Sequence, residues 1–158
     1  MALKFRSTDR FAKPDGVYGS KLVSKFLGCL MHRGKRSVAE HIFYQAMDIL
    51  HERVEDKKPL EIFEQAITNV KPIIEVRSRR IGGMTYQVPI EVKSKRQGSL
   101  AIRWLLEAAR AKKGKPMHVR LANELLDAYN RQGAAYEKRE NTHKMAEANR
   151  DFAHFASR

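Results

Sequence analysis

The sequence predicts a mainly α-helical fold, a six-helix bundle from which a two-stranded antiparallel β-ribbon protrudes between the third and fourth helices. Apolar residues recur at spacings of three and four along most of the chain, which is the periodicity of one helix face. The stretch 72–92 differs, because it alternates, is rich in β-branched and aromatic residues, and is split by Gly82-Gly83. Since an isolated two-stranded ribbon is only marginally stable in water, we expect it either to lie on the helices or to project toward a partner.

The composition is that of one domain with a modest hydrophobic core. The chain has 158 residues, of which 42% are hydrophobic, and no apolar run approaches the length needed to cross a bilayer. We expect a basic N-terminal arm over residues 1–16 and a single helical domain over residues 17–158, with the ribbon at 72–92. The arm is predicted to order only when it binds, and a short organelle-targeting peptide is the alternative.

The first three helices are predicted from their apolar faces and from residues typical of helix ends. The first covers residues 20–33. The second opens at Ser37, because Ser37 and Glu40 have the spacing of a capping box, and its buried stripe is predicted to include Val38. The third begins at Pro59, since proline suits the first helical position.

The last three helices differ strongly in polarity. The fourth follows residues 93–96 and is apolar nearly all round, which places it at the centre of the bundle. Both of its ends are basic, and cations at a helix start oppose the helix dipole, so they indicate a partner. Pro116 opens the fifth helix, and the sixth, from about Ala135 to Phe155, is polar enough to lie on the surface or against another molecule.

The register of the ribbon has two candidates. A two-residue Gly-Gly loop would place charged residues opposite apolar ones, for example Arg79 opposite Tyr86. A shift of one residue pairs Ile74 with Val92 and gathers the β-branched residues on one face. We therefore expect the shifted register, with either a three-residue loop containing a glycine bulge or a bulge near Pro89.

Positive charge is concentrated in two segments of the chain. The net charge is +13, but residues 1–36 contribute +7 and residues 71–120 contribute +10, whereas residues 37–70 contribute −4 and residues 121–158 none. A surplus that served only solubility would be spread evenly. The clustering predicts a polyanionic partner, and a solvated basic surface is the alternative.

The sequence contains no pattern typical of an enzyme or a metal site. None of the six histidines has a partner at a zinc-ligand spacing, and there is no glycine-rich phosphate loop and no nucleophile elbow. Cys29 is the only cysteine, so no internal disulfide can form, and its apolar neighbours predict a small core residue. We therefore expect no catalytic activity, no metal and no cofactor.

Binding to nucleic acid has direct support at the ribbon. Basic residues that can grip phosphates alternate there with side chains that can stack on bases, namely Arg77, Arg79, Arg80, Met84 and Tyr86. No helix-turn-helix, zinc-finger or paired-aromatic RNA motif accompanies them, which favours recognition of a folded RNA by shape. A general architectural or regulatory protein acting on DNA or its own mRNA is the second hypothesis, and an RNA-modifying enzyme is the third.

The chain resembles the bacterial-type ribosomal protein seven of the small subunit from about Pro14 to Phe155. The most telling stretches are Tyr18-Gly-Ser-Lys-Leu-Val and Glu75-Val-Arg-Ser-Arg-Arg-Ile-Gly-Gly-Met-Thr-Tyr-Gln-Val-Pro. Further matching stretches, all in the family's order, lie at 34–40, 63–72, 101–105, 121–126 and 143–150. Two positions depart from the family pattern: Gly16 and Ser94 stand where proline is usual, so the arm and the start of the fourth helix are less constrained.

The resemblance implies a helical bundle with a protruding ribbon, and a primary rRNA-binding protein that nucleates assembly of the head of the small subunit. Its implied partners are the 3′ major domain of small-subunit rRNA, exit-site tRNA, mRNA (including its own operon's message) and the small-subunit proteins nine and eleven. The implied location is the cytoplasmic ribosome, with an organellar ribosome as the alternative.

The family's contact regions can be carried over to residues of this chain. The implied rRNA contacts are Lys4, Arg6, Arg10, Lys35, Arg36, Lys93, Lys95, Arg96, Arg110, Lys112, Lys113 and Lys115. The ribbon residues implied to lie near tRNA and mRNA are Arg77, Arg79, Arg80, Gly82, Gly83, Met84 and Tyr86. The first set falls within the two basic segments that the charge distribution identifies.

Overall fold

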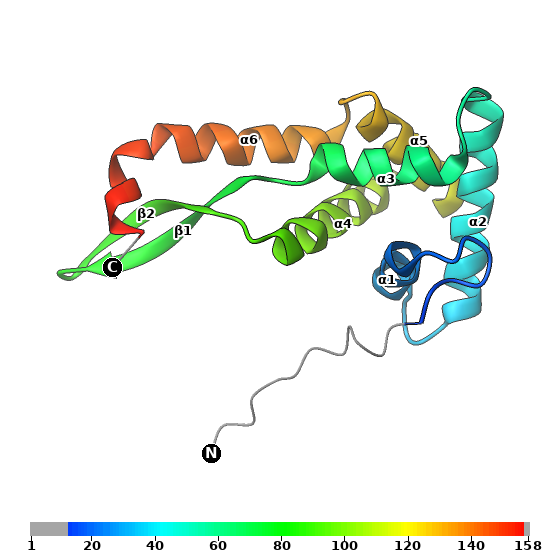
Figure 1. Cartoon of the computed structure of the whole chain (residues 1–158), viewed down its shortest axis with the longest axis horizontal. Coiled ribbons are helices and arrows are strands. Elements are labelled where there is room, and N and C mark those ends of the chain that lie inside the picture. The colour runs from blue at the N-terminus through cyan, green and yellow to red at the C-terminus, as the bar shows by residue number, and fades with distance from the viewer. Residues whose placement is uncertain (1–12, 157–158) are drawn as a thin grey trace, which may run out of the picture.

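Helices and one ribbon are arranged along an elongated molecule in the computed structural model, which describes residues 13–156 (Figure 1). The elements in order are α1 (Lys21–Leu30), α2 (Arg36–Arg53), α3 (Pro59–Val70), β1 (Ile74–Ile81), β2 (Met84–Glu91), α4 (Ser94–Ala111), α5 (Met117–Tyr129), α6 (Ala134–Ala148) and the 3₁₀ helix η2 (Arg150–Phe155). The two strands pair antiparallel between α3 and α4, which confirms the predicted fold class. No helix among the described residues is long and apolar enough to span a membrane.

The core is built around α4, as its apolar circumference predicts. This helix packs against α1, α3, α5 and α6, while α2 packs across α1, α3 and α5 at the far end from the ribbon (Figure 1). Phe26, Phe43 and Phe63 meet where α1, α2 and α3 converge, with ring centroids 5.1–5.6 Å apart, and all three are fully buried. Burial of each such side chain contributes about 2–3 kcal/mol, so this cluster fixes the packing of the first three helices.

Three details of the first helices differ from the expectations. Helix α2 begins at Arg36, so Ser37 lies inside the helix and makes no capping bond, and Glu40 instead pairs with Arg36 at 2.8 Å. Val38 is consequently 52% exposed rather than buried. Cys29 is exposed as well, because it lies just outside the α1 face that buries its apolar neighbours, so its prediction as a core residue was wrong.

The start of the described chain is tied to α2 through Asp15. This side chain is 4% exposed and accepts hydrogen bonds from the backbone N–H groups of Val17 and Tyr18 and from the Tyr44 hydroxyl, the last at 2.6 Å. Burial alone would raise the pKa of Asp15, but these hydrogen bonds outweigh it, and the pKa lies below its ordinary value. Residues 15–18 are therefore held against α2.

The ribbon adopts the register that we did not expect. Arg79 lies opposite Tyr86 and Ile81 opposite Met84, so the loop is the two-residue Gly82-Gly83 turn. Both glycines have positive φ, +58° and +87°, the geometry of the tight turn whose twist matches that of paired strands. The shifted register was predicted on the premise that the ribbon buries a whole apolar face. The charged residues Glu75 and Arg79 instead find partners on α4 and η2, so turn geometry decides the register.

The last helix is shorter than predicted. Helix α6 ends at Ala148, and the chain continues as η2 rather than as one helix to Phe155. The Asn149 side chain donates a 2.8 Å hydrogen bond to the Met145 carbonyl, which competes with the helical ladder. Beyond it, Phe152 and Phe155 turn onto the ribbon and pack against Tyr86 at centroid distances of 5.4 and 5.2 Å.

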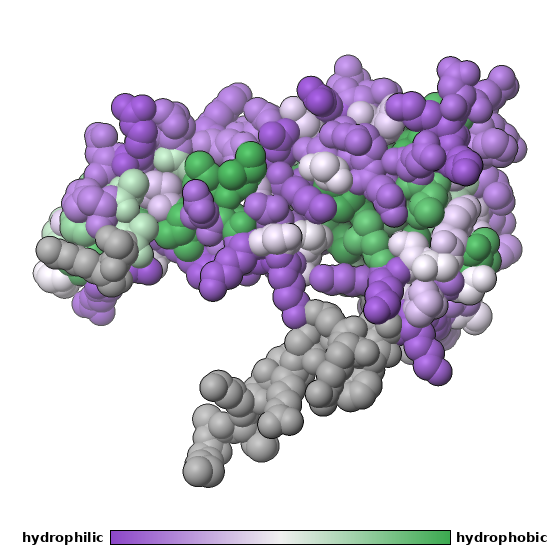
Figure 2. All heavy atoms as spheres, viewed as in Figure 1, coloured by the Kyte–Doolittle hydropathy of each residue, from purple (hydrophilic) through white to green (hydrophobic). Residues whose placement is uncertain are grey.

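A hydrophobic cavity of about 620 Å³ remains between α6 and the base of the ribbon, next to Ile73, Ile74 and Pro89. Figure 2 shows a hydrophobic area between α6 and the base of the ribbon, apart from a second one over the helices of the bundle. The ribbon is therefore supported along one side by the C-terminal elements, and its tip extends past the bundle (Figure 1).

Candidate RNA-binding surface

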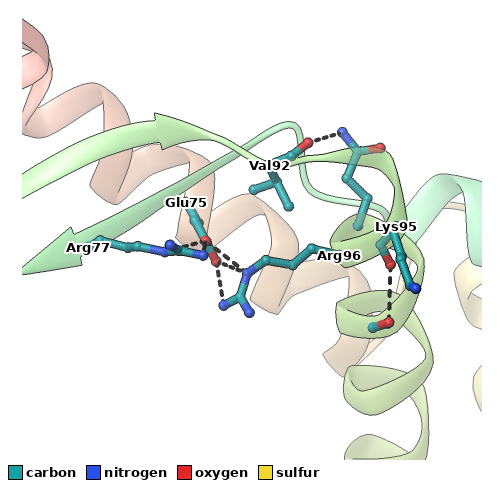
Figure 3. A network of polar contacts seen from close by, with 7 residues as sticks. Glu75, Arg77, Val92, Lys95 and Arg96 are labelled. Carbon is teal, nitrogen blue, oxygen red and sulfur yellow. Dashed lines mark hydrogen bonds and ion pairs between the residues drawn. The ribbon is translucent and has the colours of Figure 1, made fainter. Parts of the chain in front are cut away.

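The base of the ribbon is joined to α4 by an ion-pair network centred on Glu75. Its carboxylate, 8% exposed, accepts hydrogen bonds from Arg96 Nε and Nη2, both at 2.9 Å, and contacts Arg77 Nη2 at 2.7 Å (Figure 3). Burial alone would raise the pKa of Glu75, but the two arginines outweigh it and hold the pKa below its ordinary value. One carboxylate thus compensates two of the cations that the sequence assigns to RNA binding.

The residues predicted to bind RNA at the tip of the ribbon fall into two groups, those exposed to solvent and those in contact with η2. Arg80 is exposed and has no hydrogen bond or ion pair with any residue between 13 and 156, and Met84 beside the glycine turn is 63% exposed. Arg79 Nη1 instead donates a 3.0 Å hydrogen bond to the Phe155 carbonyl, and Tyr86 packs under the aromatic rings of η2. The tip therefore presents one free guanidinium and one flexible apolar side chain.

A basic groove lies between α1 and α4. It encloses about 480 Å³ and is lined by Lys25, Cys29, Arg103 and Arg110, among others. Lys25 and Arg103 have no hydrogen bond or ion pair with a described residue, and the carboxylate in the lining, Glu107, pairs with Lys138 at 2.6 Å. Arg110 Nη2 donates to the carbonyls of Cys29 and Leu30 at 3.3 Å, which satisfies carbonyls that the end of α1 leaves unpaired.

The C-terminal end of α4 has one structural cation and two free ones. Lys112 Nζ lies 2.7 Å from Glu124 Oε2 and 3.2 Å from Asp127 Oδ2. Burial alone would lower the pKa of Lys112, but its bonds with the fully buried Glu124 and with Asp127 raise it, so Lys112 stays charged to hold α4 against α5. Lys113 and Lys115 are exposed and have no partner in the described part of the chain.

The remaining predicted residues lie around the turn between α1 and α2 and at the start of α4. Lys35 is exposed at the turn, whereas the neighbouring Arg36 is in the ion pair with Glu40. Lys93 and Lys95 are exposed beside Arg96, next to the ribbon base. Lys4, Arg6 and Arg10 lie outside the described residues.

Two residues of this surface, Lys25 and Arg103, are absent from the sequence-based list. That list takes only the ends of the fourth helix, although Arg103 and Arg110 are seven residues apart and therefore lie on the same side of it. Extending the list by the position seven residues before Arg110 would have found Arg103. Lys25 carries a weaker signal, because its place in the groove depends on how α1 packs against α4.

The chemistry of this surface is that of an anion site rather than a reaction centre. Its functional groups are guanidinium and ammonium groups at spacings suited to a polyanion, and Arg forks match phosphate oxygens in geometry. No group of three or more histidine, cysteine, aspartate or glutamate side chains able to hold a metal ion occurs among residues 13–156.

Comparison with known proteins identifies the family. The model of the family described as ribosomal protein S7p/S5e matches residues 3–150. The chain belongs to this family. Small ribosomal subunit protein uS7 of Nitratiruptor sp. is 55% identical over 150 residues, which cover 95% of this chain and 96% of that protein. The proteins of the same name from Fervidobacterium nodosum and Chloroflexus aurantiacus are 57% and 59% identical, over 95% and 90% of this chain and 96% and 90% of theirs.

Membership of the S7p/S5e family confirms the resemblance seen in the sequence motifs. The match extends through the ribbon and both basic segments, so the groove and the tip lie within the part of the chain shared with the family. The family is one of ribosomal structural proteins without enzymatic activity, which confirms the prediction that this chain is not an enzyme.

Proposed function

We propose that this protein is a structural component of the small ribosomal subunit that binds the 3′ major domain of its rRNA and nucleates assembly of the head. The observation that carries the proposal is the α1–α4 groove. Lys25 and Arg103 have no partner there among the described residues, and one nitrogen of the Arg110 guanidinium donates to carbonyls at the end of α1. Lys35 and Lys93 add charge at the two ends of this surface, and Lys113 and Lys115 add charge after α4. The names of the relatives support its place in the small subunit.

The ribbon takes a second role in this proposal. Its tip projects from the bundle, away from the groove, and carries Arg80 and Met84 on its surface (Figure 1). We assign the tip to exit-site tRNA and the mRNA path, and the C-terminal elements beside it to neighbouring small-subunit proteins. The cytoplasmic ribosome is the proposed location.

The first experiment is a salt titration of binding to the 3′ major domain, beside a scrambled RNA of equal length and a duplex DNA. The wild-type chain should bind the first RNA alone near physiological salt. Lys25→Ala, Arg103→Ala and Lys113→Ala combined should weaken binding and reduce the slope of log K against log salt by about 2–3, since each phosphate contact contributes about 0.7–0.9.

Two controls make this experiment decisive. Lys57→Ala with Lys58→Ala removes charge from the acidic segment 37–70 and should leave the slope within error of wild type. Equal wild-type affinity for all three nucleic acids would instead support a general architectural or regulatory protein. Arg80→Ala with Met84→Ala should leave rRNA affinity intact while weakening the binding of exit-site tRNA to reconstituted subunits. Loss of rRNA affinity would refute the separate role of the tip.

A further inference from the structure

A second basic cavity lies on another side of α4, where the end of α3, the start of α4 and the α5–α6 turn converge with α6. It encloses about 400 Å³, and its lining includes Lys71, Gln97, Arg131, Tyr136 and Arg139. Three of these residues are cations, and no carboxylate lines the cavity. The cavity is therefore an anion site by composition, and none of its cations is among the residues expected to bind rRNA.

Two of the three cations are free to bind. Neither the Lys71 ammonium nor the Arg131 guanidinium has a hydrogen bond or an ion pair with any residue in the range 13–156. Arg139 Nη1 contacts Glu140 Oε1 at 3.1 Å, but Arg139 Nε is buried without a hydrogen-bond partner. A buried donor left unpaired is unfavourable, and an anion in the cavity would satisfy it.

The backbone at Arg131 supports a binding role. Arg131 has a φ of +59°, a conformation that glycine adopts without cost and that side chains with a Cβ disfavour. The turn holds it there, because Arg131 N–H donates to the Ala128 carbonyl at 3.1 Å and Gln132 N–H to the Asp127 carbonyl at 2.8 Å. Arginine at such a position contributes nothing to the turn that glycine would not, so its side chain needs another explanation.

The walls of the cavity are fixed and partly aromatic. Asn69 Nδ2 donates to the carbonyls of Ala128 and Tyr129, and Gln97 Nε2 donates to the Val92 carbonyl, so both amides are held in place. The Arg139 guanidinium lies over the Tyr136 ring, 5.1 Å from its centroid. An aromatic ring and an arginine plane beside free cations suit a nucleotide, which offers a phosphate and a stacking surface, better than a lone carboxylate.

We infer that this cavity binds the phosphate backbone of RNA, at a segment separate from the one that occupies the α1–α4 groove. At 100° per residue, Gln97 lies at least 120° around α4 from Ser99, Arg103 and Arg110, which line that groove. We therefore expect different stretches of RNA to occupy the two sites. The inference rests on the proposed function, and it makes the protein a bridge between two parts of one folded RNA.

The test removes the two free cations. Lys71→Ala with Arg131→Gly removes no side-chain hydrogen bond or ion pair with residues 13–156, and glycine suits the positive φ at 131. In the salt titration with the 3′ major domain, this variant should lose about 1.4–1.8 units of slope, and hydroxyl-radical footprinting should lose one protected RNA segment while the others persist. The matched control is Lys57→Ala with Lys58→Ala, which removes the same charge from the acidic segment.

A second measurement uses the wild-type protein, so it does not depend on the variant folding. Inorganic phosphate is titrated while the Nε–H signals of Arg131 and Arg139 are followed by NMR, with acetate in a parallel sample. Saturable shifts with phosphate support the site, and no shift at either signal overturns it. If acetate also gives saturable shifts, and the Lys71/Arg131 variant has the same salt slope of RNA binding as the control variant, the assignment to RNA is overturned in favour of an acidic protein segment.

The two proposals fail in different ways. If wild-type protein shows no preference for the 3′ major domain, the proposed function is refuted and the bridge with it. If wild-type protein binds that domain specifically and the Lys71/Arg131 variant matches the control in slope and footprint, only the second site is refuted.

Discussion

Glu75 controls how much of the positive charge near the ribbon is available to RNA. Its carboxylate compensates both Arg77 and Arg96, each about half exposed. Ion pairs of this exposure contribute little to stability, so Glu75→Gln should lower the free energy of unfolding by only about 1 kcal/mol. The two released guanidiniums should steepen the salt dependence of RNA binding by about 1.4–1.8 units if each gains a phosphate contact.

Urea unfolding and salt titration of the same Glu75→Gln sample check both effects. Glu91→Gln removes a carboxylate of equal charge from the exposed end of β2, where it has no ion pair with a described residue, and serves as the control. An equal steepening in both variants would mean that the effect comes from net charge rather than from release of the arginines.

His143 makes the junction between α6 and the ribbon sensitive to pH. Its Nε2 accepts a 3.1 Å hydrogen bond from the backbone N–H of Ile73, which requires that nitrogen to be unprotonated. Burial, with the nearby Arg139, lowers the pKa of His143, and Glu140 opposes this only in part. The unfolded chain therefore takes up a proton near pH 6.5 before the folded chain does, and stability decreases as the pH falls below that value.

Thermal unfolding between pH 7.5 and 5 tests this sensitivity. His143→Gln keeps an acceptor but does not titrate, so the Tm of this variant should fall less than the wild-type Tm over the same range. His41→Gln, at an exposed position on α2, should behave as wild type. Parallel curves for wild type and His143→Gln would show that His143 does not couple to folding.

At the scale of elements, replacing two glycines by alanine should change stability in opposite directions. Gly133 precedes α6 with a φ of +89°, and a Cβ there would lie 2.8 Å from Asp127 Cβ. Gly98 lies inside α4, where a Cβ would meet nothing within 4 Å. Gly133→Ala should therefore cost about 2 kcal/mol or more, while Gly98→Ala should stabilise the protein by about 0.5–1 kcal/mol. Chemical denaturation of both variants checks the pair, and the same sign for both would contradict the explanation.

Most elements were predictable because their signals are local. Helical periodicity and Pro59 were sufficient to place the starts of the helices to within a few residues, and the alternation at 72–92 was sufficient to find the ribbon. The register was not predictable from face polarity, since the partners of Glu75 and Arg79 lie on α4 and η2, far away in the sequence. The break after Ala148 also depends on a distant partner, because Phe152 and Phe155 pack on Tyr86.

At the scale of the whole molecule, the charge distribution predicts which segments bind RNA, but it does not reveal the state of each cation. Residues 71–120 hold the groove cations Arg103 and Arg110 and also Lys112, which the fold uses to hold α5. Whether a cation is free depends on which acid the packing brings beside it. A count of charges along the sequence does not contain that information. The sequence-based list of RNA-binding residues therefore includes both cations with ion-pair partners and cations without them.

The free energy needed to open the backbone hydrogen bonds of the ribbon should differ along its length, because the ribbon is attached to the rest of the molecule at two places. Glu75 and His143 hold its base, and η2 covers Tyr86 farther out, but nothing described covers Arg80 or Met84. Amide hydrogens of residues 80–85 should therefore exchange with solvent fastest, those around 86–88 more slowly, and those at the base only with sub-global opening. The tip can then change conformation around a ligand while the base opens only together with the bundle. A uniform exchange rate along both strands would show instead that the ribbon opens as one unit.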